Sequence, residues 1–213
     1  GEGDCGACTV VLGERVETAG GAPQLQLRAI NSCIRLAHSV DGLALWTVED
    51  LQHDPLIAHT AGPALHPAQA ALVQCHGSQC GFCTPGFVMS LFGLYQNHTL
   101  QGEAISRSQA QEALSGNLCR CTGYRPILEA AQSMDHYPAA PLDAQAVLQK
   151  LEQLPQQPRQ TAGDFTYKSP TGLQELLQIR ADHPQAQLVA GCTDAGLWVT
   201  KQHRRFAQVL DVT

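Results

Sequence analysis

The spacing of its cysteines constrains this chain more than any other feature of the sequence. The 213 residues contain nine cysteines, an odd number that does not suit a closed set of disulfides. Six of them lie in pairs separated by only one or two residues, which is typical of ligands to a compact metal or iron–sulfur centre. We therefore expect bound metal and a reducing, cytoplasmic compartment. In chain order the cysteines are Cys5, Cys8, Cys33, Cys75, Cys80, Cys83, Cys119, Cys121 and Cys192.

The first group of cysteines lies in and after the glycine-rich run GEGDCGACTV. Cys5 and Cys8 belong to this run, and Cys33 follows after 24 intervening residues. Plant-type [2Fe–2S] clusters take their ligands from C-x4-C-x2-C and a distant fourth cysteine, so the missing ligand would fall one position before Gly1. Glycines there would let the backbone wrap a cluster and direct N–H groups at its sulfurs. This spacing favours a [2Fe–2S] cluster over a zinc site or free thiols, because zinc ligands usually come as two C-x2-C pairs.

The second group consists of a C-x2-C pair and a C-x-C pair. Cys80 and Cys83 are separated by 35 residues from Cys119 and Cys121. Four thiolates are the ligand set of either a [2Fe–2S] cluster or a zinc ion. The short C-x-C span is awkward for a zinc knuckle but compatible with one, so spacing alone leaves both centres open.

Hydrophobic patterning predicts strands first and helices afterwards. Residues 9–12 are β-prone, and residues 25–30 alternate apolar and polar side chains as a half-buried strand does. Four short amphipathic helices are expected next, with the cysteines of the second group in their connections. These helices are predicted to open at Pro67, Thr84, Ser106 and Pro126. Thr84 is expected as the N-cap of its helix, and Ser106 with Gln109 as a capping box.

The last third of the sequence begins with a stretch rich in Pro, Gln and Ala that predicts a linker with one weak helix. The start of an α/β domain is indicated by the order of the elements that follow. These are a helix ending at His183-Pro184, a short strand at 188–190, a glycine turn and a strand at 206–212. The fold class predicted is thus a multidomain α+β chain. Its expected parts are a strand-containing domain at 1–60, a four-helix bundle at 61–138, a linker at 139–163 and the start of an α/β domain at 164–213.

Composition and motifs exclude several other classes of function. The formal net charge is −6 and no basic stripe is visible, so nucleic acid is not an expected partner. The longest apolar stretch, Gly86 to Tyr95, is too short to span a bilayer, and no membrane contact is expected. No Ser/His/Asp arrangement or carboxylate pair can be defended, so the sequence predicts a carrier of electrons without a catalytic residue of its own.

Several stretches closely resemble the molybdenum hydroxylases, the family that includes xanthine dehydrogenase and aldehyde oxidase. HGSQCGFCTPGFVMSL and LSGNLCRCTGYRPILEA resemble the family's second iron–sulfur domain, while GEGDCGACTVVLGE and AINSC resemble its first, plant-ferredoxin-type domain. TYKSPTGLQELLQIRADHPQAQLVAGCTDAGLWVTKQ resembles the opening of the FAD domain. The resemblance implies a truncated β-grasp ferredoxin-type domain at 1–60, a four-helix [2Fe–2S]-binding bundle at 61–138, a linker at 139–163 and the start of an FAD-binding domain at 164–213. The order of these parts is that of xanthine dehydrogenase, and LVAGCTDAGLWVTKQ is most similar to the small subunit of the bacterial enzymes.

This resemblance assigns roles to particular residues. It implies that Cys80, Cys83, Cys119 and Cys121 hold the [2Fe–2S] cluster nearest the molybdopterin, with Gln79 and Cys121 close to the pterin. It also implies that the backbone of one glycine turn lies along the diphosphate of FAD, as a glycine turn leading into a helix suits an anion. The residues of that turn are Leu188, Val189, Ala190, Gly191, Cys192, Thr193, Asp194 and Ala195.

The resemblance also implies a reaction and partners. Electrons would pass from a molybdopterin centre on a large subunit through two [2Fe–2S] clusters to FAD and NAD, while hypoxanthine and xanthine are oxidised to urate. The assembly expected is a heterotetramer of two small and two large subunits. An aldehyde or an N-heterocycle such as nicotinate is the alternative substrate, and a stand-alone ferredoxin-like or zinc-binding module is the alternative class. The chain is expected to be an internal fragment, inactive alone, because the first cysteine ligand and most of the FAD domain lie beyond it.

Overall fold

The computed structural model of the chain describes residues 1–18, 20–59, 65–155 and 166–213. It divides into two compact units, each described by itself. The larger unit comprises residues 4–32 and 43–153, and the smaller unit comprises residues 1–3, 33–42 and 154–213. Within the described residues, no helix combines the length and the apolar character needed to cross a membrane.

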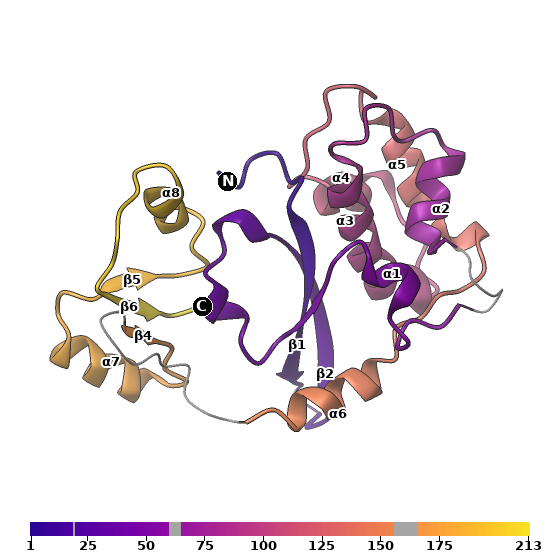
Figure 1. Cartoon of the computed structure of the whole chain (residues 1–213). Coiled ribbons are helices and arrows are strands. Elements are labelled where there is room, and N and C mark those ends of the chain that lie inside the picture. The colour runs from indigo at the N-terminus through magenta and orange to yellow at the C-terminus, as the bar shows by residue number, and fades with distance from the viewer. Residues whose placement is uncertain (19, 60–64, 156–165) are drawn as a thin grey trace. The chain divides into compact units, whose positions relative to one another are not determined.

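An antiparallel sheet forms one side of the larger unit (Figure 1). Its strands are β1 (Thr9–Glu17), β2 (Pro23–Asn31) and β3 (Ala44–Trp46), in the order β2-β1-β3. β1 and β2 pair along their whole length as a hairpin. Val11 and Leu12 are buried, and helix α3 packs on β1. The strands predicted at 9–12 from β-propensity and at 25–30 from alternation are both confirmed and are longer than expected, whereas the short β3 was not predicted.

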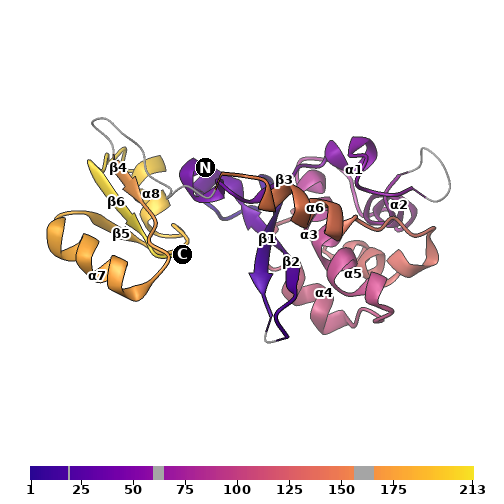
Figure 2. The same ribbon diagram turned by 90° about the horizontal axis from the view of Figure 1, so that it is seen from below.

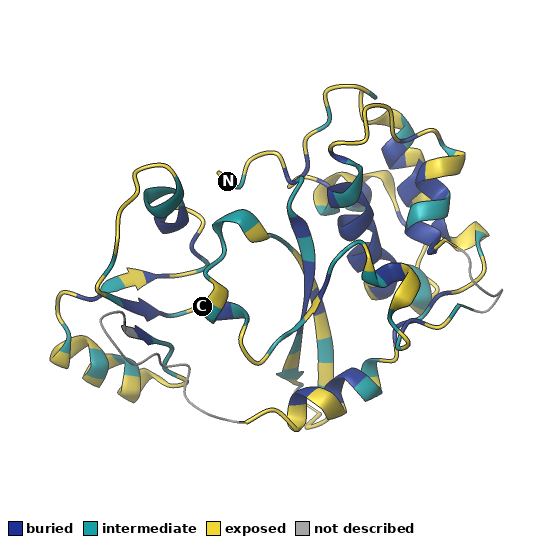
Figure 3. Cartoon of the chain, viewed as in Figure 1, coloured by how far each residue is buried: buried dark blue, intermediate teal, exposed yellow. Residues whose placement is uncertain are grey.

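Helices make up the rest of the larger unit. The four predicted ones are α2 (Pro67–Gln74), α3 (Thr84–Asn97), α4 (Arg107–Ala113) and α5 (Arg125–Gln132), and a short α1 (Asp50–His53) precedes them. α3 is the central helix, and nearly all of its side chains are buried (Figure 3). Its cap differs from expectation: the Cys83 carbonyl accepts the first helical hydrogen bond, from Phe87 N at 3.1 Å, so Cys83 is the N-cap and Thr84 the first helical residue.

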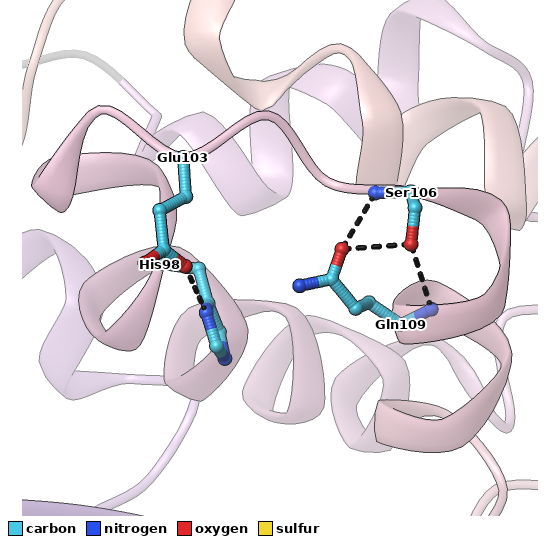
Figure 4. Close-up of polar contacts among 4 residues, drawn as sticks. All are labelled: His98, Glu103, Ser106 and Gln109. Carbon is cyan, nitrogen blue, oxygen red and sulfur yellow. Dashed lines mark hydrogen bonds and ion pairs between the residues drawn. The ribbon is translucent and has the colours of Figure 1, made fainter.

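The capping box predicted at Ser106 is present (Figure 4). Gln109 N donates to Ser106 Oγ at 3.2 Å, and Ser106 N donates to Gln109 Oε1 at 2.9 Å. Just after α3, His98 Nδ1 lies 2.7 Å from Glu103 Oε2. These contacts fix the connection between α3 and α4. The remaining short elements are the 3-10 turns η1 (Ser32–Ile34), η2 (Ala37–Val40), η3 (Thr99–Gln101) and η4 (Met134–His136).

One helix forms within the stretch predicted as a linker. This helix, α6 (Ala144–Glu152), is capped by Asp143 and contacts β2, and both ribbon views show it beside the sheet (Figures 1 and 2). Val147, Leu148 and Leu151 on one face of it are buried. The predicted linker's residues 156–163 lie outside the described residues, and the predicted domain boundaries stay predictions.

A parallel sheet organises the smaller unit. Its strands are β4 (Thr166–Lys168), β5 (Gln187–Val189) and β6 (Gln208–Asp211), in the order β4-β6-β5. Helix α7 (Leu173–Asp182) connects β4 to β5, and α8 (Ala195–Thr200) connects β5 to β6. The Tyr167 hydroxyl donates to buried Asp211 at 2.6 Å. An antiparallel sheet, a helical region and the start of a parallel α/β domain confirm the predicted fold class.

Candidate redox site

The second group of cysteines lies in two loops at helix starts in the larger unit. Cys80 and Cys83 lead directly into α3, and Gly81 between them has φ +85°. Cys119 and Cys121 lie in the loop before α5, where Tyr124, the residue before the helix, also has a positive φ. Backbone in the left-handed region turns the chain sharply, which lets two loops present their thiols at one place.

The four thiols of this group meet in pairs. Cys80 and Cys121 share a hydrogen bond between their side chains, and so do Cys83 and Cys119. A dinuclear iron–sulfur cluster takes four cysteine thiolates, two on each iron, so the donor set fits a [2Fe–2S] cluster. Among the described residues, no three His, Cys, Asp or Glu side chains converge as ligands of one metal ion.

Hydrogen bonds prepare one of these thiols to ionise. Burial opposes the charge of Cys119, but hydrogen bonds from Thr122, the backbone of Cys121 and the thiol of Cys83 together lower its pKa to about 7. Thr122 Oγ1 lies 3.2 Å from Cys119 Sγ, and Cys121 N donates to the same sulfur at 3.4 Å. Burial and the bond to Cys119 instead raise the pKa of Cys83 to about 11. Donors aimed at a ligand sulfur stabilise the thiolate that a metal centre requires.

The outer pair shows the same asymmetry. The backbone of Phe82 and the thiol of Cys121 lower the pKa of Cys80, and the bond from Cys80 raises the pKa of Cys121. Both residues are exposed, as is Gln79 beside them. Exposed apolar side chains flank these thiols, with Phe82 73% and Leu118 46% exposed. This end of the bundle therefore combines accessible thiols with an apolar rim.

Tyr124 contacts both the C-x-C loop and helix α3. Cys119 N donates to the Tyr124 hydroxyl at 3.0 Å, and the Tyr124 ring packs edge-on against Phe87 of α3. A hollow of about 400 Å³ beside the loop is lined in part by Leu118 and Gln111. The sequence pattern did not single out Tyr124, although its place at the start of a helix carrying Pro126 marks it as a boundary residue.

The first group of cysteines is divided between the units. In the larger unit, Cys5 and Cys8 lie in the loop before β1, where Gly6 has φ +72° and its carbonyl accepts Thr9 N at 3.0 Å. The Ser32 hydroxyl donates to the Cys8 carbonyl at 2.8 Å. Within the smaller unit, Gly3 N donates to Cys33 Sγ at 3.3 Å, an N–H to sulfur contact of the kind that tunes cluster potentials. The joint ligand role of this group stays a prediction.

The loops of the two groups touch within the larger unit. Leu118 N donates to the Cys5 carbonyl at 2.9 Å. The Asn117 side chain donates to the Gly6 carbonyl at 3.0 Å and accepts from Ser90 on α3 at 2.6 Å. Sequence reasoning missed both Asn117 and Ser90, because the partners are far apart in the chain. The available sequence signal for a contact was that Asn117 and Ser90 are polar residues beside apolar segments that also carry cysteines.

The turn predicted to bind FAD lies at the carboxyl end of β5 in the smaller unit. Gly191 and Cys192 follow one another with φ of +69° and +63°. Gly191 N donates to Thr213 Oγ1 at 2.8 Å, which joins the turn to the segment after β6. Ligands of open parallel sheets bind at the carboxyl ends of strands, and consecutive turned N–H groups suit an anion, so the turn fits a nucleotide diphosphate.

Two cysteines, Cys192 and Cys75, belong to neither group. Burial raises the pKa of the Cys192 thiol, and so does nearby Asp211, while Arg35 acts in the opposite direction. Cys192 is only 5% exposed, and the role of its backbone at the FAD stays a prediction. Cys75 is half-buried at the end of α2, with its Sγ 3.8 Å from Ser133 Oγ.

Two protein families match parts of this chain. Residues 47–132 match the family described as "[2Fe-2S] binding domain". Residues 163–213 match the family described as "FAD binding domain in molybdopterin dehydrogenase". The fold and the site thus define an iron–sulfur and flavin-binding region of an oxidoreductase.

Several known oxidoreductases are similar to this chain in sequence. Xanthine dehydrogenase of Drosophila pseudoobscura pseudoobscura is 33% identical in an alignment that covers 100% of this chain and 18% of the relative. Aldehyde oxidase 2 of Cavia porcellus is 34% identical, over 92% of this chain and 17% of the relative. Among solved structures, quinoline 2-oxidoreductase of Pseudomonas putida 86 is 31% identical, with a TM-score of 0.46, covering 70% of this chain and 72% of that one.

The chain belongs to the molybdenum hydroxylase family, as the iron–sulfur and FAD-binding region of such an enzyme. It spans less than a fifth of the length of the curated relatives xanthine dehydrogenase and aldehyde oxidase, 18% and 17% respectively.

Proposed function

We propose that this chain relays electrons inside a molybdenum hydroxylase, from a molybdopterin centre on a partner subunit to FAD and then NAD. The observation that carries the proposal is the pairwise meeting of four thiols, one of them with its pKa lowered to about 7, at an exposed end of the helical bundle. When bound there, a [2Fe–2S] cluster supplies one-electron redox chemistry that no side chain of the set possesses.

The protein's own residues have distinct tasks in this scheme. Cys80, Cys83, Cys119 and Cys121 would hold the first carrier to receive electrons, and Cys5, Cys8 and Cys33 would hold the second. Thr122 and the backbone around Cys119 keep a ligand sulfur in its charged form. The N–H group of Gly3 donates a hydrogen bond to the Cys33 sulfur at 3.3 Å. The turn from Leu188 to Ala195 would receive the FAD diphosphate.

The partner's site would lie over the exposed thiols of the second group. Cys121 and Gln79 are exposed there, and apolar Phe82 and Leu118 surround them. An apolar rim around redox ligands suits a protein surface that excludes water on docking. We therefore assign this face to a molybdopterin-binding large subunit, in a heterotetramer of two small and two large subunits.

Purines are the proposed substrates, with hypoxanthine and xanthine oxidised to urate. The support is the order of the domains and the similarity to xanthine dehydrogenases along the whole chain. Similarity to an aldehyde oxidase and a quinoline 2-oxidoreductase makes aldehydes and N-heterocycles the second candidate class. Production of urate by the assembled enzyme supports the purine assignment, and oxidation of only aldehydes or N-heterocycles overturns it.

Metal analysis of the purified holoprotein tests the relay itself. The proposal predicts iron and acid-labile sulfide, visible absorption, and paramagnetic signals that appear on reduction with dithionite. Serine at Cys119 is expected to abolish the signal of one cluster only, because that variant keeps the first cysteine group intact. A protein that contains zinc and no iron would be a zinc-binding module, and the relay would be wrong.

A further inference from the structure

Asn117 is a buried amide that joins three parts of the larger unit. It is 3% exposed and uses both ends of its side chain. Ser90 Oγ, on α3, donates to Asn117 Oδ1 at 2.6 Å. Asn117 Nδ2 donates to the Gly6 carbonyl at 3.0 Å and to Thr9 Oγ1 at 3.0 Å. The amide therefore links the central helix to the loop that precedes β1.

Both loops joined by this amide carry cysteines. Gly6 directly follows Cys5, and Asn117 stands two residues before Cys119. Leu118, between Asn117 and Cys119, donates its N–H to the Cys5 carbonyl at 2.9 Å. A shift of the Asn117 side chain would thus move the backbone beside a ligand of each cysteine group.

The surrounding backbone leaves little space for the two loops to separate or slide. A Cβ on Gly6 would overlap the Gly116 carbonyl, and a Cβ on Gly86 would overlap the Gly6 carbonyl. The loops are therefore in direct backbone contact, and small residues permit it. When backbones pack this closely, a few hydrogen bonds determine the position of one loop relative to the other.

Only an amide of this size meets the requirements of the position. Ser90 donates to this side chain, whereas the Gly6 carbonyl and the Thr9 hydroxyl both accept from it. Aspartate would turn an acceptor toward the Gly6 carbonyl, and serine is too short to reach both sides. A buried group with this complement of partners fixes geometry more than it adds stability.

We infer that Asn117 is a positioning residue for electron transfer between the two cysteine groups, because its amide sets the separation and orientation of the two clusters. The inference rests on the proposed function, since it requires that both groups bind [2Fe–2S] clusters. The contacts of the Asn117 amide are to Ser90, Gly6 and Thr9, so it acts on the ligand sulfurs through the loops.

Magnetic coupling between the two reduced clusters measures this geometry directly. The experiment compares the holoprotein with Asn117→Ser and with Asn97→Ser, after reduction by dithionite. Asn97 is the matched control, since its Nδ2 also ties α3 to the sheet, at 3.1 Å from the Leu27 carbonyl, with neither partner in a cysteine loop. We expect Asn117→Ser to change the spin–spin splitting with unaltered iron content, and Asn97→Ser to keep the wild-type splitting. Hydrogen exchange of residues 4–9 should rise in Asn117→Ser alone.

Several outcomes would overturn the inference. Unchanged splitting in Asn117→Ser, or an equal change in Asn97→Ser, contradicts a positioning role for Asn117. If Asn117→Ser fails to fold, Ser90→Ala removes only the hydroxyl that orients the amide, and it should shift the splitting in the same direction. Loss of cluster iron from Ser90→Ala would make the amide a requirement for assembly instead. Zinc without iron in the wild type refutes the proposed function, and the inference with it, before any variant is compared.

Discussion

Replacing Gly86 by alanine tests whether a close backbone contact outweighs helix propensity in its effect on stability. Gly86 lies in the first turn of α3, and its backbone is ordinary right-handed helix, so alanine meets no conformational obstacle there. A Cβ at this position would, however, overlap the Gly6 carbonyl and approach Asn117 Nδ2 to 2.8 Å. Gly93 in the same helix is the matched control, because its Cβ would lie 3.7 Å from Val11, an ordinary contact.

The two substitutions should have opposite effects on stability. Alanine gains up to about 1 kcal/mol over glycine inside a helix. At Gly93 nothing opposes this gain, and we expect a stabilisation of roughly 0.5–1 kcal/mol. At Gly86 overpacking costs about 1–3 kcal/mol, at the upper end because a backbone carbonyl has no rotamer to change. The variant should therefore lose roughly 1–2 kcal/mol net, from the difference between these terms.

Thermal and urea unfolding, followed by far-UV circular dichroism, measure the difference. About 1 kcal/mol shifts the Tm of a chain of this size by roughly 2–4 °C, so the two variants should differ by roughly 5–10 °C. Gly86→Ala should also raise hydrogen exchange in the loop at residues 4–9. If Gly86→Ala is as stable as Gly93→Ala, the close contact between α3 and the loop at residues 4–9 is wrong.

Three further predictions concern pKa values and buried hydrogen bonds. Burial lowers the pKa of His66 to about 3, against about 6.5 in the unfolded chain, so the unfolded state binds the extra proton at low pH. The contribution of neutral His66 to the free energy of unfolding should therefore be fully present above pH 6.5. Between about pH 6 and pH 4 the free energy of unfolding should fall by about 1.4 kcal/mol per pH unit. The same slope in His66→Gln would contradict this explanation. Gln96→Leu removes two buried hydrogen bonds to residues 140–142 and should cost roughly 2–3 kcal/mol in urea unfolding, whereas a loss under about 0.5 kcal/mol would refute their importance. In protein freed of iron, iodoacetamide at pH 7.5 should modify Cys119 before Cys83, since their pKa values are about 7 and about 11, and the reverse order would overturn the assigned thiolate.

Sequence patterns predicted the local elements of the site well. The four helices of the bundle and the capping box at Ser106 follow from periodicity and end signals that operate within a few residues. Cysteine spacing was sufficient to identify the four thiols that meet in pairs. The strands β3 and β4, of three residues each, were missed, whereas β5 of the same length was predicted from its apolar run directly before a glycine turn.

Contacts between distant segments could not be predicted from the sequence. Asn117 and Gly6 are 111 residues apart, and no local rule links their positions. The burial of α6 was also missed, although Val147 and Leu151 are spaced one helical turn apart and could have indicated a buried face. Such contacts depend on how whole elements pack, and they set the relation between the two cysteine loops.

The order of the electron carriers underlies the whole relay, and it can be measured by flavin reduction in the holoenzyme with Cys119→Ser. Cys119 belongs to the group proposed to receive electrons first, and in the same proposal NADH exchanges electrons at the FAD end. We predict that hypoxanthine no longer reduces the flavin in this variant, whereas NADH still reduces an artificial dye at nearly the wild-type rate. Equal loss of both activities, or retention of both, would contradict the proposed relay.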